Sequence, residues 1–165
     1  MKKTSKKGVT LVELCITIAL LALVAGICAS LLITGLEDAR KNSEEAAFVS
    51  GANLLITSLN TDLDFTKNGD ATVEVTTEEK SGYSVSTIRV TMDATTVHEY
   101  IYQESTGKIY YKASEDATSM ICPYVKNAVF SRYNQGSGDG LKSMINIQLQ
   151  CSLDDKWLET SFYVR

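Results

Sequence analysis

The residue best placed to do chemistry is Glu13, a carboxylate at the border of a long uncharged segment. It is the only charged residue between Lys7 and Glu37. At about 1.5 Å of helical rise per residue, residues 14–36 cover roughly 35 Å, enough to cross a bilayer core with some tilt. A carboxylate at such a border costs on the order of a few kcal/mol unless it is paired, so Glu13 is a candidate functional residue. A glutamate that snorkels to the membrane surface is the alternative interpretation.

The other candidates for chemistry are four cysteines and a single histidine. Cys122 and Cys151 could form one disulfide or remain two buried thiols, whereas Cys15 and Cys28 lie in the apolar segment as small apolar side chains. The chain has no CxxC pair, and His98 alone gives no support to a zinc or redox site. No nucleophile, base and orienting group can be brought together from the pattern. We therefore predict no enzyme activity, no catalytic residues, no metal and no cofactor.

A more specific pattern surrounds Glu13. The run Gly8-Val9-Thr10-Leu11-Val12-Glu13-Leu14 follows a lysine-rich leader and precedes the uncharged segment. This combination resembles the processing and methylation signal of type IV prepilins and type II secretion pseudopilins. The resemblance covers about the first 36 residues, and the rest of the chain matches the family only in layout. Many bacterial pilins carry a proline within the span, but the only proline here is Pro123.

The resemblance implies a set of partners and a role for each residue of the motif. A membrane-bound prepilin peptidase is expected to cleave between Gly8 and Val9 and to methylate the new amine of Val9. The Glu13 carboxylate of a neighbouring subunit could then offset that ammonium, and the pairing would fix the axial register of assembly. Other pilin subunits would be contacted through the N-terminal helix, and the membrane would hold the chain before assembly. Adhesion, motility, DNA uptake and secretion all stay open as the task of the filament, as does a major or minor place in it.

Charge predicts the orientation of the chain. Four lysines precede the span and Glu37-Asp38 follows it, which predicts a cytoplasmic N-terminus and an extracytoplasmic remainder. The resemblance implies that the chain lies first in the inner membrane and then in a surface or periplasmic filament. A secretory signal peptide is disfavoured because Glu13 interrupts its apolar core, and a plain signal-anchor leaves Gly8 and Glu13 unexplained. Beyond Gly8 there are 12 basic and 20 acidic residues, a net charge of −8, which disfavours direct nucleic-acid binding by the head.

Helical periodicity continues beyond the span. Apolar residues recur on one side of a helical wheel, while Asn53, Thr57 and Asn60 fall elsewhere. The apolar set is Phe48, Ala52, Leu55, Ile56, Leu59 and Leu63. One helix is therefore expected from about residue 10 to about residue 60. The predicted organisation is a leader (1–8), a membrane and assembly half of the helix (9–36), an amphipathic half (37–63) and an extracytoplasmic β-rich head (64–165).

The head shows strand patterns rather than a binding motif. Runs at residues 72–76, 83–92, 97–103, 108–112, 144–153 and 157–164 predict strands, with 104–107 as a hairpin loop. In the clearest strand, alternate apolar residues from Ile145 to Leu153 define a core face, and Leu158, Phe162 and Val164 share a face of the last strand. Asp62, Asp64, Asn68 and Asp70 are interpreted as solvated turn residues rather than a calcium loop. Six tyrosines could form a sugar- or surface-binding patch, but they, like His98, are interpreted as ordinary sheet residues. They are Tyr100, Tyr102, Tyr110, Tyr111, Tyr124 and Tyr133.

These observations predict an α+β fold in which a long N-terminal helix lies on a small antiparallel sheet. The expected function is that of a prepilin-like structural subunit. A membrane-anchored extracellular binding module that does not polymerise is the alternative. A secreted enzyme with a signal peptide would instead begin near residue 31. The start of the mature chain separates the three.

Overall fold

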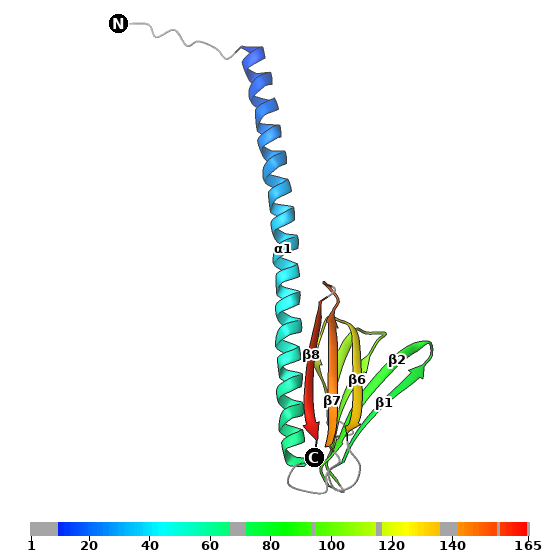
Figure 1. Cartoon of the computed structure of the whole chain (residues 1–165). Helices are drawn as coiled ribbons and strands as arrows, with labels where there is room; N and C mark the ends of the chain where they lie inside the picture. The colour runs from blue at the N-terminus through cyan, green and yellow to red at the C-terminus, as the bar shows by residue number, and fades with distance from the viewer. Residues whose placement is uncertain are drawn as a thin grey trace, which may run out of the picture. The chain divides into compact units, whose positions relative to one another are not determined.

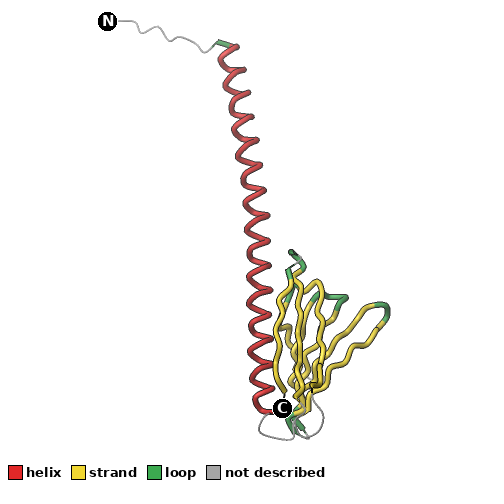
Figure 2. The backbone as a smooth tube through the Cα atoms, in the orientation of Figure 1, coloured by secondary structure: helices red, strands yellow, loops and turns green. Residues whose placement is uncertain are grey.

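The computed structural model describes residues 10–66, 72–93, 95–114, 117–135, 142–154 and 156–164. Within them, one helix, α1 (Leu11–Thr66), precedes all of the β-structure, as Figures 1 and 2 show. The predicted α+β class is confirmed. The strands are β1 (Thr72–Lys80), β2 (Tyr83–Thr91), β3 (Val97–Gln103), β4 (Lys108–Ser114), β5 (Ala117–Cys122), β6 (Val125–Gln135), β7 (Lys142–Cys151) and β8 (Trp157–Val164).

The chain forms two compact units, Met1–Asn42 and Ser43–Arg165. Residues 11–42 of α1 belong to the first unit. From residue 14 to residue 36 this part of the helix has no charged side chain on any side. The last six turns of α1 and all of the strands belong to the second unit, which we call the head. The division lies within the charged stretch that follows the uncharged segment of the sequence.

The strands of the head form two antiparallel sheets rather than the single sheet expected. One has the order β1-β2-β3-β4-β5, and the other has the order β6-β7-β8. The hairpin between β3 and β4 turns at 104–107, as predicted. Two of the strands, β5 and β6, were not predicted. The Tyr102 hydroxyl donates to the Lys126 carbonyl over 3.1 Å, and the Arg132 guanidinium donates to the Val73 carbonyl, so hydrogen bonds join the two sheets.

The amphipathic stripe of α1 is the centre of the head's core. Five of its six predicted apolar residues are at most 5% exposed, while Ile56 is half-buried. They form one buried cluster with residues from both sheets, including Ile88, Tyr100, Ile109 and Ile147. Asn53, Thr57 and Asn60 are exposed, as the helical wheel predicted. The same face of the helix therefore provides the surface on which both sheets are packed.

The alternation predicted for the clearest strand is confirmed over most of its length. Ile145, Ile147, Leu149 and Cys151 are at most 3% exposed along β7. Leu153 was placed on the same face, and this was wrong, because β7 ends at Cys151 and Leu153 is 38% exposed beyond it. On β8, Val164 is buried and its predicted companions Leu158 and Phe162 are partly buried against the core.

A glycine permits the closest approach of α1 to the sheet. A Cβ atom at Gly51 would lie 2.7 Å from both the Cys122 Cα and the Ile121 carbonyl oxygen. Carbon atoms do not approach so closely without displacement, so any larger residue would force the helix away from the end of β5. Gly51, which has a poor intrinsic helix propensity, is therefore explained by tertiary packing.

Candidate functional site

The predicted processing residues and the predicted assembly residue differ in what the structure says of them. Gly8 and Val9, the proposed cleavage junction and methylation site, lie outside the described residues. Glu13 lies in the first turn of α1. Its surroundings can therefore be examined directly.

Glu13 takes part in a hydrogen-bonded cap at the start of the helix. The Thr10 backbone N–H and the Thr10 hydroxyl each donate to Glu13 Oε2 over 3.2 Å, and the Glu13 backbone N–H lies 3.3 Å from Thr10 Oγ1. Leu14 N–H donates to the Thr10 carbonyl over 3.1 Å, which marks Thr10 as the residue that caps the helix. Such a reciprocal arrangement satisfies two backbone donors that a helix start leaves unpaired. Thr10 was not singled out from the sequence, although Thr-x-x-Glu is the usual pattern of this cap.

The cap leaves part of the carboxylate available. Both hydrogen bonds that the carboxylate accepts use Oε2, and in the part of the chain that the structure describes Oε1 accepts no hydrogen bond. An ionised carboxylate can accept about four hydrogen bonds over its two oxygens. Glu13 can therefore serve its own helix and still accept from a second group.

The helix that follows Glu13 exposes an apolar surface. Every Leu, Ile and Val side chain from Leu11 to Leu36 is at least 54% exposed. By length and composition, the helix is long and apolar enough to cross a membrane. Its two threonine hydroxyls are satisfied locally, since Thr17 donates to the Leu14 carbonyl over 2.8 Å and Thr34 to the Ser30 carbonyl over 3.1 Å. Such a surface needs lipid or other apolar helices to cover it.

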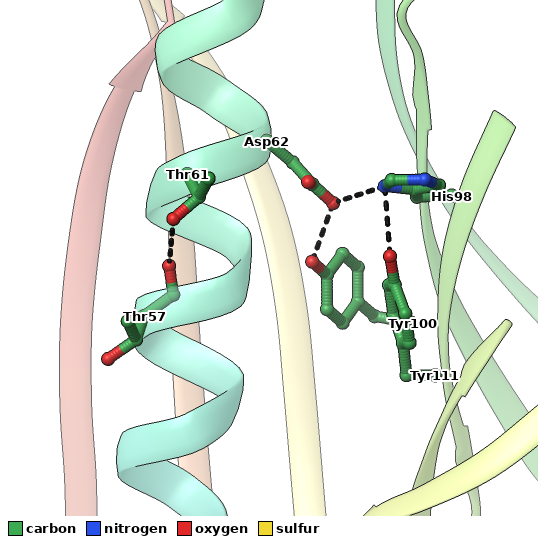
Figure 3. Close-up of polar contacts among 6 residues, drawn as sticks. All are labelled: Thr57, Thr61, Asp62, His98, Tyr100 and Tyr111. Atoms are coloured by element: carbon green, nitrogen blue, oxygen red, sulfur yellow. Dashed lines mark hydrogen bonds and ion pairs between the residues drawn. The ribbon is translucent and has the colours of Figure 1, made fainter. Parts of the chain in front are cut away.

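A second cluster of chemical groups lies inside the head. The Asp62 cluster consists of Asp62 on α1, His98 and Tyr100 on β3, and Tyr111 on β4 (Figure 3). Asp62 Oδ2 accepts from the Tyr100 hydroxyl over 2.6 Å and lies 2.9 Å from His98 Nδ1. The Tyr111 hydroxyl lies 3.1 Å from the same nitrogen. Since a lone pair on Nδ1 would face an ionised carboxylate, Nδ1 carries the proton when Asp62 is charged.

The Asp62 cluster is buried and packed. Asp62 is 6% exposed and Tyr100 is fully buried. The rings of His98 and Tyr111 meet edge to face at 5.4 Å, and those of Tyr100 and Tyr111 are tilted at 5.2 Å. Burial, and the hydrogen bond to Asp62, raise the pKa of Tyr100 far above its ordinary value; burial and the Asp62 charge also raise the pKa of Tyr111. Both phenols therefore stay protonated at neutral pH. Tyr100 donates to Asp62, and the Tyr111 hydroxyl oxygen faces the His98 Nδ1–H as an acceptor.

The Asp62 cluster corrects two interpretations of the sequence. Asp62 is not a solvated turn residue, because α1 continues to Thr66 and places it against the sheet. His98 is more than an ordinary strand residue, because it meets that carboxylate. No buried side-chain nitrogen or oxygen among the described residues lacks a hydrogen-bond partner, so the cluster is satisfied within the fold. Its chemistry is that of a clamp between helix and sheet rather than of an acid–base site.

Of the two alternatives left open for Cys122 and Cys151, the structure shows the one without a disulfide. Cys122 and Cys151 are both free buried thiols. The Cys122 thiol is directed instead at backbone oxygens, with Sγ 3.6 Å from the Phe48 carbonyl and 3.7 Å from the Pro123 carbonyl. Burial first, and the neighbouring Cys151 second, raise the pKa of Cys122 to about 12. A thiol that stays protonated is a poor nucleophile, so Cys122 contributes to the core. Cys151 is buried in the same core cluster.

The described residues assemble no candidate metal site. No group of three His, Cys, Asp or Glu side chains within those residues is placed to hold an ion. Comparison of the chain with protein-family models, curated proteins and solved structures found no match. Function is therefore inferred from the residues themselves, above all from Glu13 and the apolar surface beyond it.

Proposed function

We propose that this chain is a prepilin-like structural subunit of a type IV pilus or of a type II secretion pseudopilus. In this proposal prepilin peptidase cleaves after Gly8 and methylates Val9. The chain crosses the inner membrane once with its N-terminus in the cytoplasm, and it then enters an extracytoplasmic filament through its N-terminal helix. The observation that carries the proposal is the exposed apolar surface of the first unit, in which Glu13 is the only charge between Lys7 and Glu37.

The division of α1 supports this proposal. The apolar stripe of the amphipathic half is buried in the core of the head, and no residue of the apolar half belongs to that core. Lipid can cover the apolar half before assembly, and the same half of neighbouring subunits can cover it afterwards. A single carboxylate at the start of this surface would then meet the new ammonium of a neighbour. Burying the two charges as a pair costs far less than burying either alone.

A membrane-anchored binding module that does not polymerise is the second candidate, and the cap favours it. Because Thr10 already gives the Glu13 carboxylate a partner within the same helix, a plain anchor would also keep this glutamate. The filament subunit needs the negative charge of Glu13 to pair with a neighbour. The plain anchor needs only the hydrogen bonds that Glu13 makes in the cap. A short series of variants separates the two properties.

The experiment compares Glu13→Gln, Glu13→Ala and Thr10→Ala, each expressed as the sole copy. Glutamine can replace glutamate in this kind of cap but has no charge. Thr10→Ala keeps the charge and removes a capping hydroxyl, at a cost of about 1 kcal/mol. Sheared filaments and membrane-retained protein are then counted for each variant.

The filament proposal expects both Glu13 variants to remain in the membrane with few filaments, while Thr10→Ala assembles. Leaving a neighbour's ammonium unpaired would cost on the order of a few kcal/mol at each contact. Entry of Glu13→Gln and Glu13→Ala into filaments at wild-type levels would show that the charge has no part in assembly. Loss of assembly in Thr10→Ala and Glu13→Ala alone would assign Glu13 to the cap.

A further inference from the structure

The β6-β7-β8 sheet has an outer face that the core does not use. Along β7 the odd-numbered residues from Ser143 to Cys151 are buried, so the even-numbered residues point outward. Strand pairing aligns them in rows with outward residues of β6 and β8. The outer face is defined by Tyr133, Asn146, Gln148, Trp157, Glu159 and Tyr163. Figure 1 shows its three strands side by side.

Aromatic side chains occupy the two ends of this face. The row Tyr133–Met144–Tyr163 lies at one end, with the two tyrosines 54% and 66% exposed. Trp157, which is 48% exposed and pairs with Gln150, lies at the other end. At about 3.3 Å per residue along a strand, the two ends of β8 are roughly 20 Å apart. Exposed aromatic side chains therefore lie at both ends of the face, and a ligand that contacts both ends must be about 20 Å long.

The centre of the outer face is polar and ordered apart from Val129, which pairs with Gln148 and is 41% exposed. Glu159 Oε1 accepts from the Asn146 amide over 2.8 Å and from the Gln148 amide over 3.1 Å. The Ser161 hydroxyl lies 3.4 Å from Asn146 Oδ1. The two amide donors lower the pKa of Glu159, so its carboxylate is ionised at neutral pH. Amides that are already hydrogen-bonded to one carboxylate present their remaining donors and acceptors in a fixed arrangement.

This arrangement of residues discriminates between classes of ligand. A protein interface has an apolar, dry centre with its aromatic anchors there and a polar rim, whereas here the centre is polar and the aromatic residues are at the ends. A nucleic acid or another polyanion needs Lys and Arg, yet the rows from Asn127–Gln150–Trp157 to Tyr133–Met144–Tyr163 contain neither and have Glu159 at their middle. An uncharged ligand rich in hydroxyl groups suits a polar centre with aromatic ends, and it needs no Lys or Arg.

We propose that the outer face binds a neutral oligosaccharide. The C–H faces of its sugar rings would stack on Trp157 at one end and on Tyr133 and Tyr163 at the other, since the negative face of an aromatic ring attracts polarised C–H groups. Its hydroxyl groups would exchange hydrogen bonds with Asn146, Gln148 and Glu159 between them. The proposal does not rest on the proposed function, because every residue of the outer face belongs to the head and Glu13 has no part in it.

The test uses the full chain in micelles of a detergent without a sugar headgroup. Trp157 is the only tryptophan in the chain, so its fluorescence reports a ligand on the outer face directly. Cellohexaose, chitohexaose and maltohexaose are titrated as neutral probes, with polygalacturonate as a polyanion control, and calorimetry provides the affinities. We expect a saturable change in emission with at least one neutral probe and none with the polyanion.

Variants assign the binding to the outer face. Trp157→Ala and Tyr163→Ala should each weaken binding by about tenfold, as loss of a stacked ring does. Trp157→Phe should retain most of the affinity by calorimetry, and Tyr83→Ala on the other sheet should retain all of it. Far-UV circular dichroism checks that each variant is folded.

Two results would overturn the proposal. One is the absence of binding by all three neutral probes, or binding that Trp157→Ala and Tyr163→Ala leave unchanged. The other is normal folding with impaired filament formation in these variants and no oligosaccharide binding by the wild type, which would make the outer face a contact between subunits.

Discussion

Removal of the Asp62 carboxylate should loosen α1 from the sheet, and the size of the effect follows from the Asp62 cluster. Asp62 Oδ2 is the acceptor for the Tyr100 hydroxyl at 2.6 Å and lies 2.9 Å from His98 Nδ1. Asp62→Ala leaves the fully buried Tyr100 hydroxyl without an acceptor, which costs about 1–3 kcal/mol. The His98 side chain is 18% exposed and can turn partly to water, so its loss is smaller. The sum is about 2–4 kcal/mol.

The assay is thermal unfolding of the full chain in micelles, followed by Trp157 fluorescence. For a head of this size, 3 kcal/mol corresponds to a decrease in melting temperature of roughly 10 °C. Asn60→Ala, an exposed change two residues away on the same helix, should stay within about 0.5 kcal/mol of wild type. Asp62→Asn keeps one acceptor for Tyr100 and should lie between them.

A double-mutant cycle tests the reasoning more closely. Tyr100→Phe removes the donor that Asp62→Ala leaves unpaired, so it should cost clearly less in the Asp62→Ala background than in wild type. If Asp62→Ala is as stable as Asn60→Ala, or if the two changes are additive, the carboxylate does not hold the helix to the sheet.

Three further predictions follow from packing, pH and thiol chemistry. Gly51→Ala should destabilise the head by about 1–3 kcal/mol, although alanine has the better helix propensity. Gly26→Ala is the control, because no atom lies within 4 Å of its new Cβ, and it should leave the melting temperature of the head unchanged. Equal melting temperatures of the two variants would contradict the close approach at Gly51. Hydrogen bonds from Thr95 and Thr96 lower the pKa of Asp93 from 3.8 to about 2, so its contribution is complete above pH 4 and is lost as the pH falls toward 2. The difference in melting temperature between wild type and Asp93→Ala should therefore shrink over that range, and a constant difference would exclude this origin. Cys122 and Cys151 should resist alkylation in the folded head and react only after unfolding, and recovery of a cystine peptide instead would contradict the two free thiols.

Periodicity explains how much of the fold was predictable. The stripe from Phe48 to Leu63 and the alternation along β7 both arise from burial of one face, which a sequence records directly. β6 was not recognised because a bulge between Val125 and Asn127 shifts its alternation by one residue, after which Ala128 and Phe130 face the core. The division of the strands into two sheets depends on pairing between strands, which local patterns do not specify.

The candidate sites were predictable to a different extent. Glu13 stands out because its charge conflicts with its surroundings, and this signal is local. The Asp62 cluster joins residues 36 and 38 positions apart, so neither Asp62 nor His98 carried a sign of the other in the sequence. The outer face likewise needs the register of three strands before Tyr133, Asn146 and Trp157 can be placed on one surface. Thr10 could have been found, since Thr-x-x-Glu before an apolar run is a known helix start.

The most direct test of the filament proposal is the intact mass of the protein extracted from membranes of cells with an active prepilin peptidase. The account predicts a chain that begins at Val9, with the mass of residues 1–8 removed and one methyl group added. Gly8→Leu should remain unprocessed in the membrane, while Gly26→Leu, a matched change within the span, should be cleaved as wild type. A mature protein that still carries Met1 to Gly8, or one that begins near Leu31, would contradict the central claim.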